Sequence, residues 1–288
     1  MSIEENNNKL NVLKIQPARK LGAGRGWYWI NEGFRYFNQA KYTWMLSIFV
    51  FVFNAMFLVY IFPVFQILLI LIFPFITVGF AMACHDIELG KPMSIAYLFK
   101  GFTHINKLNI LRYGFMLIFL MIIAQIISSM FIGLFGISQD AIAIEIQYLS
   151  TQTDASFQSI LDSPVLLKYF IVTIAVMLPI TAINLIAPYL IAFSNLTVPQ
   201  VIKHSFLAVI KNIFALLVYA FILVIIFSVA VLLLKGINAL LTLLLNNNPV
   251  IVSYINIVML MPLMMAFVSL SYCSAYVAFK DMFLGEEI

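Results

Sequence analysis

The chain has 288 residues, of which 64% are hydrophobic and only 10% are charged, and its formal net charge is +4. Soluble domains contain roughly 25% charged and 45–50% apolar residues, so the composition excludes a soluble protein and predicts a single membrane domain. Cys84 and Cys273 form no CxxC motif or Cys/His cluster, and we interpret both as packing residues.

The first 21 residues are polar and mixed in charge, and they lack the basic-then-apolar order of a cleaved signal peptide. We expect residues 1–21 to form a flexible cytoplasmic tail, followed by a membrane domain at residues 22–288. Gly22, Gly24 and Gly26 make a GxGxG run, but no strand precedes it and no P-loop lysine follows. We therefore interpret the run as a flexible entry to the first helix and not as a nucleotide site.

Six long apolar stretches dominate the rest of the chain. Each is at least as long as the roughly 20 residues that cross a bilayer as a helix. Their uninterrupted apolar character favours helices over the alternating strands of a barrel. The sequence therefore predicts an all-α membrane protein with six transmembrane helices. The stretches are residues 43–62, 64–84, 108–137, 166–193, 212–234 and 250–279.

Two segments leave alternatives open. Only Pro63 separates the first two apolar stretches, which form either a tight hairpin that crosses the membrane fully or a re-entrant pair. Residues 138–164 form the main loop on the other side of the membrane. Ile142, Ile144, Ile146 and Tyr148 alternate as in a strand, yet the same region also fits one face of a helix.

The basic residues predict the orientation. Of the 16 lysines and arginines, 14 lie before the first stretch, after the second, after the fourth or after the sixth. Lysine and arginine accumulate in cytoplasmic segments of membrane proteins, so both termini are predicted to be cytoplasmic. This asymmetry also explains the net charge without nucleic-acid binding, and basic segments of this kind favour anionic lipid headgroups.

A segment with helical periodicity precedes the first, third and fifth stretches. These segments predict three amphipathic helices in the cytoplasmic membrane interface, with aromatic side chains at headgroup depth. In the first segment the interfacial anchors are Trp27, Trp29, Phe34 and Phe37. The second segment is residues 94–105, and the third is residues 198–210.

The ends of the second, fourth and sixth stretches resemble one another, as residues 83–86, 192–195 and 278–281. Each unit would hold one interfacial helix, one span out and one span back, which predicts a threefold direct repeat at about 26–90, 93–197 and 198–285. Asp86, Asn195 and Asp281 follow the spans as candidate structural caps. The two aspartates could also pair with basic residues of the neighbouring interfacial helix.

The polar residues of the spans give few indications of chemistry. The spans contain no Asp, Glu or Arg at mid-depth, where such residues usually mark ion or proton pathways. Asn54, Gln125 and Asn184 are a candidate polar centre, although such groups more often bridge helices. No pair of the three histidines has the i, i+4 spacing of a shared metal site, and no catalytic motif is present. The sequence predicts no metal, no cofactor and no catalytic residue.

Several short aromatic-rich blocks resemble a family of uncharacterised proteobacterial inner-membrane proteins, and the chain is distantly similar to YciC-like membrane proteins. The resemblance covers roughly residues 24–283 and implies the six-span architecture without implying any catalytic residue. The blocks are residues 25–30, 32–34 with Phe37, 79–84, 187–188, 201–206 and 211–212.

These observations predict a multi-pass protein of the bacterial inner membrane that is not an enzyme. The expected function is that of a scaffold or accessory subunit, with membrane lipids and another membrane protein complex as partners. The alternative is a transporter or flippase-like protein for an apolar or amphipathic substrate.

Overall fold

The computed structural model describes residues 13, 15–151, 157–244 and 249–285. The regular structure in these ranges is helical and contains no strand, which confirms the predicted all-α class. Six of the helices are long and apolar enough to cross a membrane, so the structure supports a multi-pass membrane protein. The chain forms two compact units, Met1–Gly114 with Leu185–Ile288, and Phe115–Asn184.

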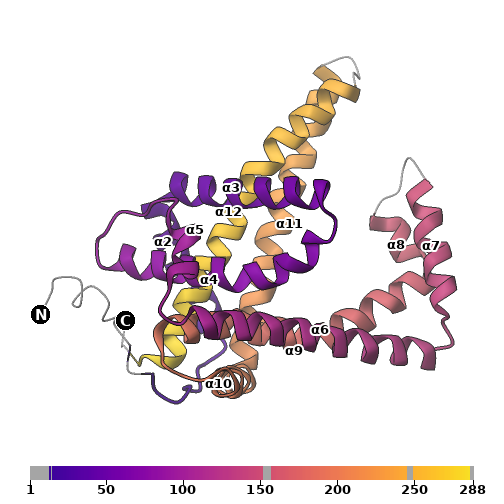
Figure 1. Ribbon diagram of the computed structural model, residues 1–288. Helices are drawn as coiled ribbons and strands as arrows, with labels where there is room; N and C mark the ends of the chain where they lie inside the picture. The colour runs from indigo at the N-terminus through magenta and orange to yellow at the C-terminus, as the bar shows by residue number, and fades with distance from the viewer. Residues whose placement is uncertain (1–12, 14, 152–156, 245–248, 286–288) are drawn as a thin grey trace, which may run out of the picture. The chain divides into compact units, whose positions relative to one another are not determined.

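The first unit contains most of the helices (Figure 1). The start of α6 (Lys107–Leu134) and the end of α9 (Pro164–Phe193) also belong to it. Its complete helices are α2 (Arg25–Gln39), α3 (Lys41–Ile61), α4 (Phe65–Glu88), α5 (Tyr97–Thr103), α10 (Val198–Lys211), α11 (Ile213–Leu244) and α12 (Pro249–Phe283).

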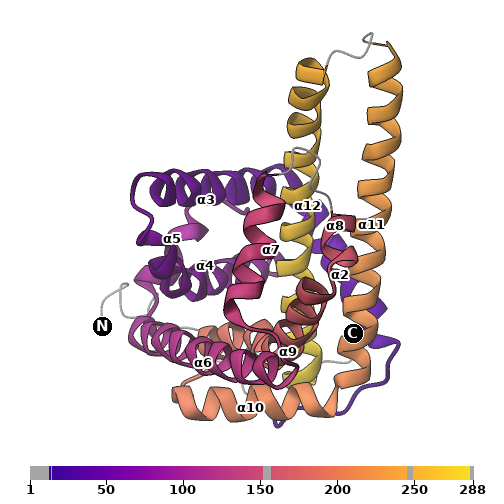
Figure 2. The same ribbon diagram turned by 90° about the vertical axis from the view of Figure 1, so that its right-hand side faces the viewer.

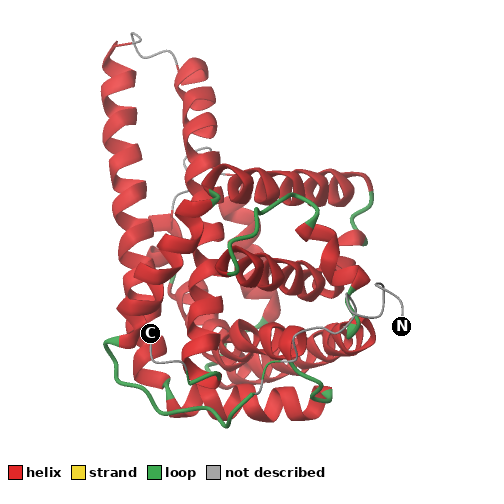
Figure 3. Cartoon of the chain, turned by 90° about the vertical axis from the view of Figure 1, so that its left-hand side faces the viewer, coloured by secondary structure: helices red, strands yellow, loops and turns green. Residues whose placement is uncertain are grey.

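Two helical hairpins form the frame of this unit. α11 and α12 lie side by side as a long hairpin, and α3 and α4 run across it (Figures 2 and 3). α3 and α4 have 21 and 24 residues, so each is long enough to span the roughly 30 Å hydrocarbon layer at 1.5 Å per residue. Aromatic rings join the hairpins. The ring centroids of Trp44 in α3 and Phe80 in α4 are 5.2 Å apart, and those of Phe80 and Tyr272 in α12 are 4.8 Å apart.

α2 packs directly against α11 and α12, and two glycines explain how closely it does so. A Cβ atom on Gly33 would lie 2.6 Å from the main-chain nitrogen of Ser274 in α12. A Cβ atom on Gly26 would lie 2.6 Å from the main-chain nitrogen of Tyr219 in α11. Small residues at helix contacts allow backbones to approach in this way. The buried face of α2 therefore follows its glycines, at Gly26, Trp29, Ile30, Gly33, Tyr36 and Phe37.

The second unit has its own small core. α6 and α9 contribute most of their length to it, together with α7 (Gln139–Thr151) and α8 (Phe157–Asp162). Ile132, Ile142 and Leu166 are buried against one another, and the hydroxyl groups of Ser128 and Thr173 are 3.1 Å apart. Most of the described part of the loop predicted at residues 138–164 is helical, as α7 and α8.

The largest difference from the predicted spans is the length of α11. The predicted span ends at residue 234, just before Lys235, whereas α11 continues to Leu244. A single lysine does not end a helix, because its aliphatic stem can lie along the apolar surface while the ammonium group reaches water. α12 likewise includes Lys280 and Asp281 in its last turn, beyond the predicted end at residue 279.

The close contact at Gly33 predicts a measurable loss of stability. We expect Gly33→Ala to destabilise the folded protein by about 2 kcal/mol, because the added Cβ would overlap the α12 backbone and overpacking costs roughly 1–3 kcal/mol. Thermal unfolding in detergent would measure the change. Gly236→Ala in α11 is the control, since its Cβ would meet open space and helix propensity favours alanine by about 0.5–1 kcal/mol. Equal stability of the two variants would contradict the proposed contact.

Candidate functional site: an ionic layer at the helix ends

Asp281 is the most completely buried carboxylate in the described part of the chain, with a side-chain exposure of 1%. It lies in the last turn of α12 and accepts hydrogen bonds from two residues of α2. Arg25 donates through Nε to Oδ2 and through a terminal nitrogen to Oδ1, both at 2.7 Å, and Trp29 Nε1 donates to Oδ2 at 2.7 Å. Charge-assisted bonds of this geometry are among the strongest in proteins.

Asp86 connects α4 and α5 in the same way. We call the contacts of the Asp281 and Asp86 carboxylates the two joints. The Asp86 carboxylate accepts hydrogen bonds from Lys91 at 2.8 Å, from the Tyr97 hydroxyl at 2.6 Å and from Lys100 at 3.3 Å. Lys100 also lies over the Tyr97 ring, 3.5 Å from its centroid. Burial raises the pKa of Tyr97, and the hydrogen bond to Asp86 raises it further, so the phenol remains the donor at neutral pH.

In both joints, the aromatic hydrogen-bond donor and the glycine of the close helix contact are four residues apart. Trp29 donates to Asp281, and Gly33, four residues later, is the point where α2 meets the α12 backbone. Tyr97 donates to Asp86, and Gly101, four residues later, meets the α4 backbone. Residues four apart lie on the same face of a helix. α2 and α5 therefore each present an aromatic donor and a glycine on one face.

The helices that carry the two aspartates, α4 and α12, also show a common spacing. Ser274 lies seven residues before Asp281 and contacts Gly33, while Gly79 lies seven residues before Asp86 and is equally tight against α5. A seven-residue spacing is close to two helical turns, so the small residue and the carboxylate share a face. The end of the second span thus holds the interfacial helix that follows it, and the end of the sixth span holds the first.

The end of the fourth span is arranged differently. Asn195, the third candidate cap, lies exposed just beyond α9. The carbonyl groups at the end of α9 are bound by Asn106 instead, whose Nδ2 donates to Ile191 O at 3.0 Å and to Ser194 O at 2.9 Å. Asp86 and Asp281 lie inside the last turns of their helices and act as acceptors for neighbouring cations.

A third carboxylate connects the two joints. Glu88, at the end of α4, pairs with Lys280 of α12 and accepts a hydrogen bond from the Tyr276 hydroxyl at 2.9 Å. The Tyr276 oxygen is in turn 3.2 Å from Nδ1 of His85. Lys280 is only 6% exposed, so its charge is compensated by the protein and not by water.

The segment that precedes α2 binds the ends of several helices. Residue 13 and residues 15–21 belong to the N-terminal tail predicted at residues 1–21. The main-chain nitrogens of Leu13, Gln16 and Arg19 donate to Phe193 O, Phe283 O and Met282 O, respectively. The last carbonyls of a helix have no partners within it, and this segment supplies donors for α12. We call residues 13 and 15–21 the N-terminal strap.

The strap also contacts the junction of α10 and α11. Asn212 accepts from the Leu21 main-chain nitrogen at 2.8 Å and donates to Arg19 O at 2.9 Å, and Lys211 donates to Ala18 O at 3.0 Å. The Arg19 side chain reaches Asp281, donating to its main-chain oxygen at 2.7 Å and lying 3.4 Å from Oδ1. Asp281 therefore connects α12, α2 and the strap. We call the strap and the groups around Asp86, Glu88 and Asp281 the ionic layer.

The predicted interfacial anchors lie on two sides of α2. Trp29 and Phe37 are buried at 0% and 8% exposure, and their environment is the protein itself. Trp27 and Phe34 are exposed, at 58% and 50%. The outward face of α2 thus carries two large aromatic side chains next to Asn31, Arg35 and Asn38, which line a polar hollow with Glu32 and Gln39.

The three residues of the candidate polar centre belong to different units of the structure. Asn54 belongs to the first unit and lines an apolar cavity between α3, α4 and α5. Its Nδ2 donates to Val50 O of its own helix at 2.7 Å. Gln125 and Asn184 belong to the second unit and lie exposed on α6 and α9. Within the described residues, no three His, Cys, Asp or Glu side chains are arranged to hold a metal ion.

The partners of Asp281 could have been found by comparing the two interfacial segments with each other. Both contain an aromatic donor followed by glycine at a spacing of four, and both carboxylates follow a small residue at a spacing of seven. The strap carries no comparable signal, because, apart from the Arg19 side chain, it contacts the helices described above through its main-chain groups. Comparisons of the chain with models of known families, with characterised proteins and with solved structures gave no match.

Removal of the Asp281 charge should lower stability without unfolding the chain completely. Breaking a fully buried ion pair costs roughly 3–5 kcal/mol, but Arg25 is 34% exposed and can still be hydrated. We therefore expect Asp281→Asn to cost about 2 kcal/mol, or roughly 4–8 °C in Tm. Thermal unfolding in detergent micelles measures this change.

The matched control for Asp281→Asn is Glu32→Gln on the outward side of α2. Glu32 pairs with Arg35, which is 64% exposed, and exposed pairs contribute roughly 0–1 kcal/mol. A Tm for Asp281→Asn no lower than that of Glu32→Gln would show that the buried carboxylate does not hold the layer together.

Protonation of His104 should weaken the contact between α5 and α6. His104 is 3% exposed and its Nδ1 accepts a hydrogen bond from the Asn106 main-chain nitrogen at 3.0 Å. Burial lowers the pKa of His104, an effect that the Ala192 main chain partly opposes. A lowered folded-state pKa means that its stabilising contribution is complete above about pH 6.5 and is lost as the pH falls below that value.

Thermal unfolding as a function of pH tests this contact. The Tm should fall as the pH decreases below about 6.5, and His104→Gln should reduce that dependence because it removes the titrating group. Identical pH profiles for the unsubstituted protein and His104→Gln would refute the assignment.

Proposed function

We propose that this protein is a non-enzymatic scaffold or accessory subunit of the bacterial inner membrane, which engages lipid or another membrane protein complex. The observation that supports it is the saturation of the ionic layer. Four donor groups from Arg19, Arg25 and Trp29 surround the Asp281 carboxylate, and donors from Lys280 and Tyr276 bind Glu88. Carboxylates with this many charged and neutral donors serve to fix helices, whereas acid–base catalysis needs a group that can exchange its proton.

The proposed orientation has both termini in the cytoplasm. Gln16 of the strap donates to Phe283 O at the end of α12, so the described parts of the two chain ends lie together. Arg19, Arg25, Lys91, Lys100, Lys211 and Lys280 gather in the ionic layer. Clustered lysine and arginine favour the cytoplasmic side of a membrane. Membership of the uncharacterised inner-membrane family that the sequence resembles belongs to the same proposal.

The outward face of α2 is the proposed contact with a partner. Its buried face is fixed by the glycine contacts and by Asp281, so Trp27, Phe34 and Arg35 are presented from a rigid helix. Tryptophan and arginine are enriched among the residues that dominate binding energy at protein interfaces. A rigid surface loses less conformational entropy on binding than a mobile one.

Native mass spectrometry of the protein released gently from its own membrane tests this function. We expect stoichiometric co-release of another membrane protein, and we expect the double substitution Trp27→Ala and Phe34→Ala to reduce it by at least about tenfold, because such residues carry several kcal/mol at interfaces. Leu207→Ala, at an exposed position on α10, is the control. Release of the protein alone or only as a homo-oligomer would contradict the accessory-subunit role.

The alternative function, transport of an apolar or amphipathic substrate, is favoured by one observation. The cavity between α3, α4 and α5 contains Asn54, one of the three polar span residues that a transport site was expected to use. In vesicles reconstituted with the protein, a transporter would move a labelled hydrocarbon-chain substrate from one side of the membrane to the other, whereas a scaffold would not.

A further inference from the structure

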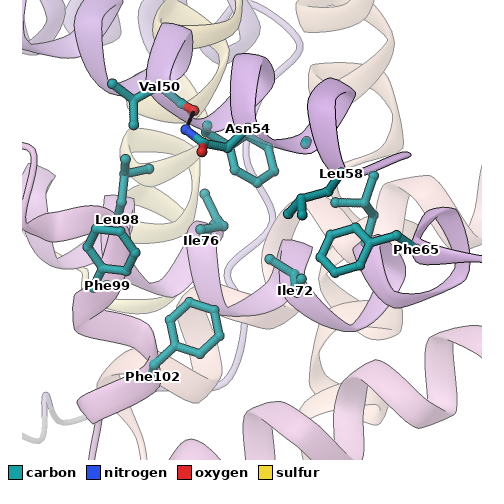
Figure 4. A pocket seen from close by; sticks show the side chains of 12 residues that line it. Val50, Asn54, Leu58, Phe65, Ile72, Ile76, Leu98, Phe99 and Phe102 are labelled. Atoms are coloured by element: carbon teal, nitrogen blue, oxygen red, sulfur yellow. Dashed lines mark hydrogen bonds between the residues drawn. The ribbon is translucent and has the colours of Figure 1, made fainter. Parts of the chain in front are cut away.

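The first unit contains an apolar cavity of about 280 Å³, close to the lower end of the roughly 300–1,000 Å³ range of ligand pockets. One wall is α3, the opposite wall is α4, and α5 forms the end (Figure 4). Along α4 the lining runs from Phe65 to Ile76, which at 1.5 Å per residue corresponds to about 16 Å. The cavity is therefore a slot between two helices of membrane-spanning length.

The walls of the slot differ in how firmly they are held. Gly79 of α4 lies against the main chain of Tyr97, and Gly101 of α5 lies against the main chain of Phe75, so α4 and α5 meet backbone to backbone. The Phe75 and Phe102 rings stack at a centroid distance of 4.6 Å with an interplanar angle of 4°. α3 meets this wall through side chains: the Phe51 and Phe73 rings lie 5.4 Å apart between centroids, and the lining residues Val50, Phe51, Ala55 and Leu58 are half-buried. The slot is therefore bounded by an α4–α5 wall held backbone to backbone and by α3, which packs against that wall through side chains.

The lining selects a hydrocarbon. Of the twelve lining residues, eleven are apolar, and Asn54 has the only polar side chain. One N–H of the Asn54 amide is donated to Val50 O, which leaves the second N–H and Oδ1 (Figure 4). A stable water molecule needs two to four polar partners, and the lining of the slot offers a single polar side chain. Water is therefore a poor occupant.

The surroundings decide which hydrocarbon is available. α3 and α4 have the length and hydropathy of membrane spans, so the medium outside their exposed faces is lipid. Phe99 and Phe102 of α5 are 62% and 40% exposed at the end of the slot, so the slot is accessible from that medium. A helix with side chains is about 10–12 Å across, too wide for a cavity of this volume, whereas a single acyl chain is narrow and flexible.

We infer that the slot between α3 and the α4–α5 wall binds one acyl chain of a membrane phospholipid. This inference rests on the proposed lipid-engaging function and assigns it a site. The headgroup stays at the membrane surface, while the chain lies along Leu69, Ile72 and Ile76. The site is distinct from the ionic layer, because it uses the apolar side of α5 whereas Lys100 and Tyr97 use the other side to bind Asp86.

The test uses the purified full-length protein in nanodiscs of phosphatidylethanolamine and phosphatidylglycerol. Native mass spectrometry after release from the nanodisc measures the fraction of protein that retains a phospholipid. Ala55→Phe places a phenyl ring in the slot and should lower that fraction about tenfold, because the ring occupies the space of the chain. Met56→Phe adds a ring at the neighbouring, outward position of α3, which is 64% exposed, and should leave retention unchanged.

A second measurement keeps the inference testable if Ala55→Phe fails to fold. Phosphatidylglycerol with a photoactivatable diazirine in one acyl chain is added to the unsubstituted protein, and the labelled peptides are mapped after irradiation. Labelling concentrated on α3, α4 and α5 at the slot supports the site. Labelling spread evenly over the exposed faces of the spans, or equal phospholipid retention by a folded Ala55→Phe, overturns it.

The identity of the retained mass is also decisive. A bound small molecule that is not a phospholipid overturns the assignment of the occupant and favours the transport alternative. Because this test uses no partner protein, its failure leaves the co-release experiment unaffected, and a failure of co-release leaves the slot unaffected.

Discussion

The buried carboxylate of Asp281 is the constraint on which the first unit depends. A carboxylate at the end of a helix faces the negative end of the helix dipole, and burial removes the water that would otherwise stabilise its charge. Asp281 is tolerable in the last turn of α12 only because Arg25, Trp29 and Arg19 donate to it. These donors come from α2 and from the strap. The chemistry of one side chain therefore fixes the first helix of the unit to the last.

The same constraint occurs at Asp86 and extends the arrangement around the unit. Asp86 holds α5 through Tyr97 and Lys100, and Glu88 connects the end of α4 to α12 through Lys280. The rest of the protein covers little of the membrane-spanning parts of α11 and α3. Only 6% of the most apolar window of α11 and 17% of that of α3 is buried inside the protein. In lipid there is little hydrophobic drive between helices, so polar joints at the helix ends are an effective way to fix their positions.

This division between helix ends and spans supports the proposed scaffold function. The ionic layer is rigid and its carboxylates are saturated, while α2 turns Trp27 and Phe34 outward from it. The apolar slot lies on the opposite side of α5 from the Asp86 joint, so the contact that orders α5 also forms the end of the slot. Protein contact and lipid contact are thus assigned to different faces of elements that the same layer holds.

The amino-acid sequence by itself determined the class and the spans, because the length and composition of an apolar stretch decide whether it can exist in lipid. The helices begin and end within a few residues of the predicted bounds, except where Lys235 was taken as the end of α11. The sequence also indicated that Asp86 and Asp281 could pair with basic residues of neighbouring helices. Local pattern was enough for these inferences.

Only the tertiary structure decided which face of α2 is buried and what holds the chain ends. The helical period of α2 is plain in the sequence, but its buried face combines Gly26 and Gly33 with Trp29, because the glycines allow close backbone approach to α11 and α12 and Trp29 donates to Asp281. The strap binds Phe193, Met282 and Phe283 through main-chain groups that every residue possesses. No side-chain pattern can encode such contacts locally, so they become visible only once the helix ends are assembled.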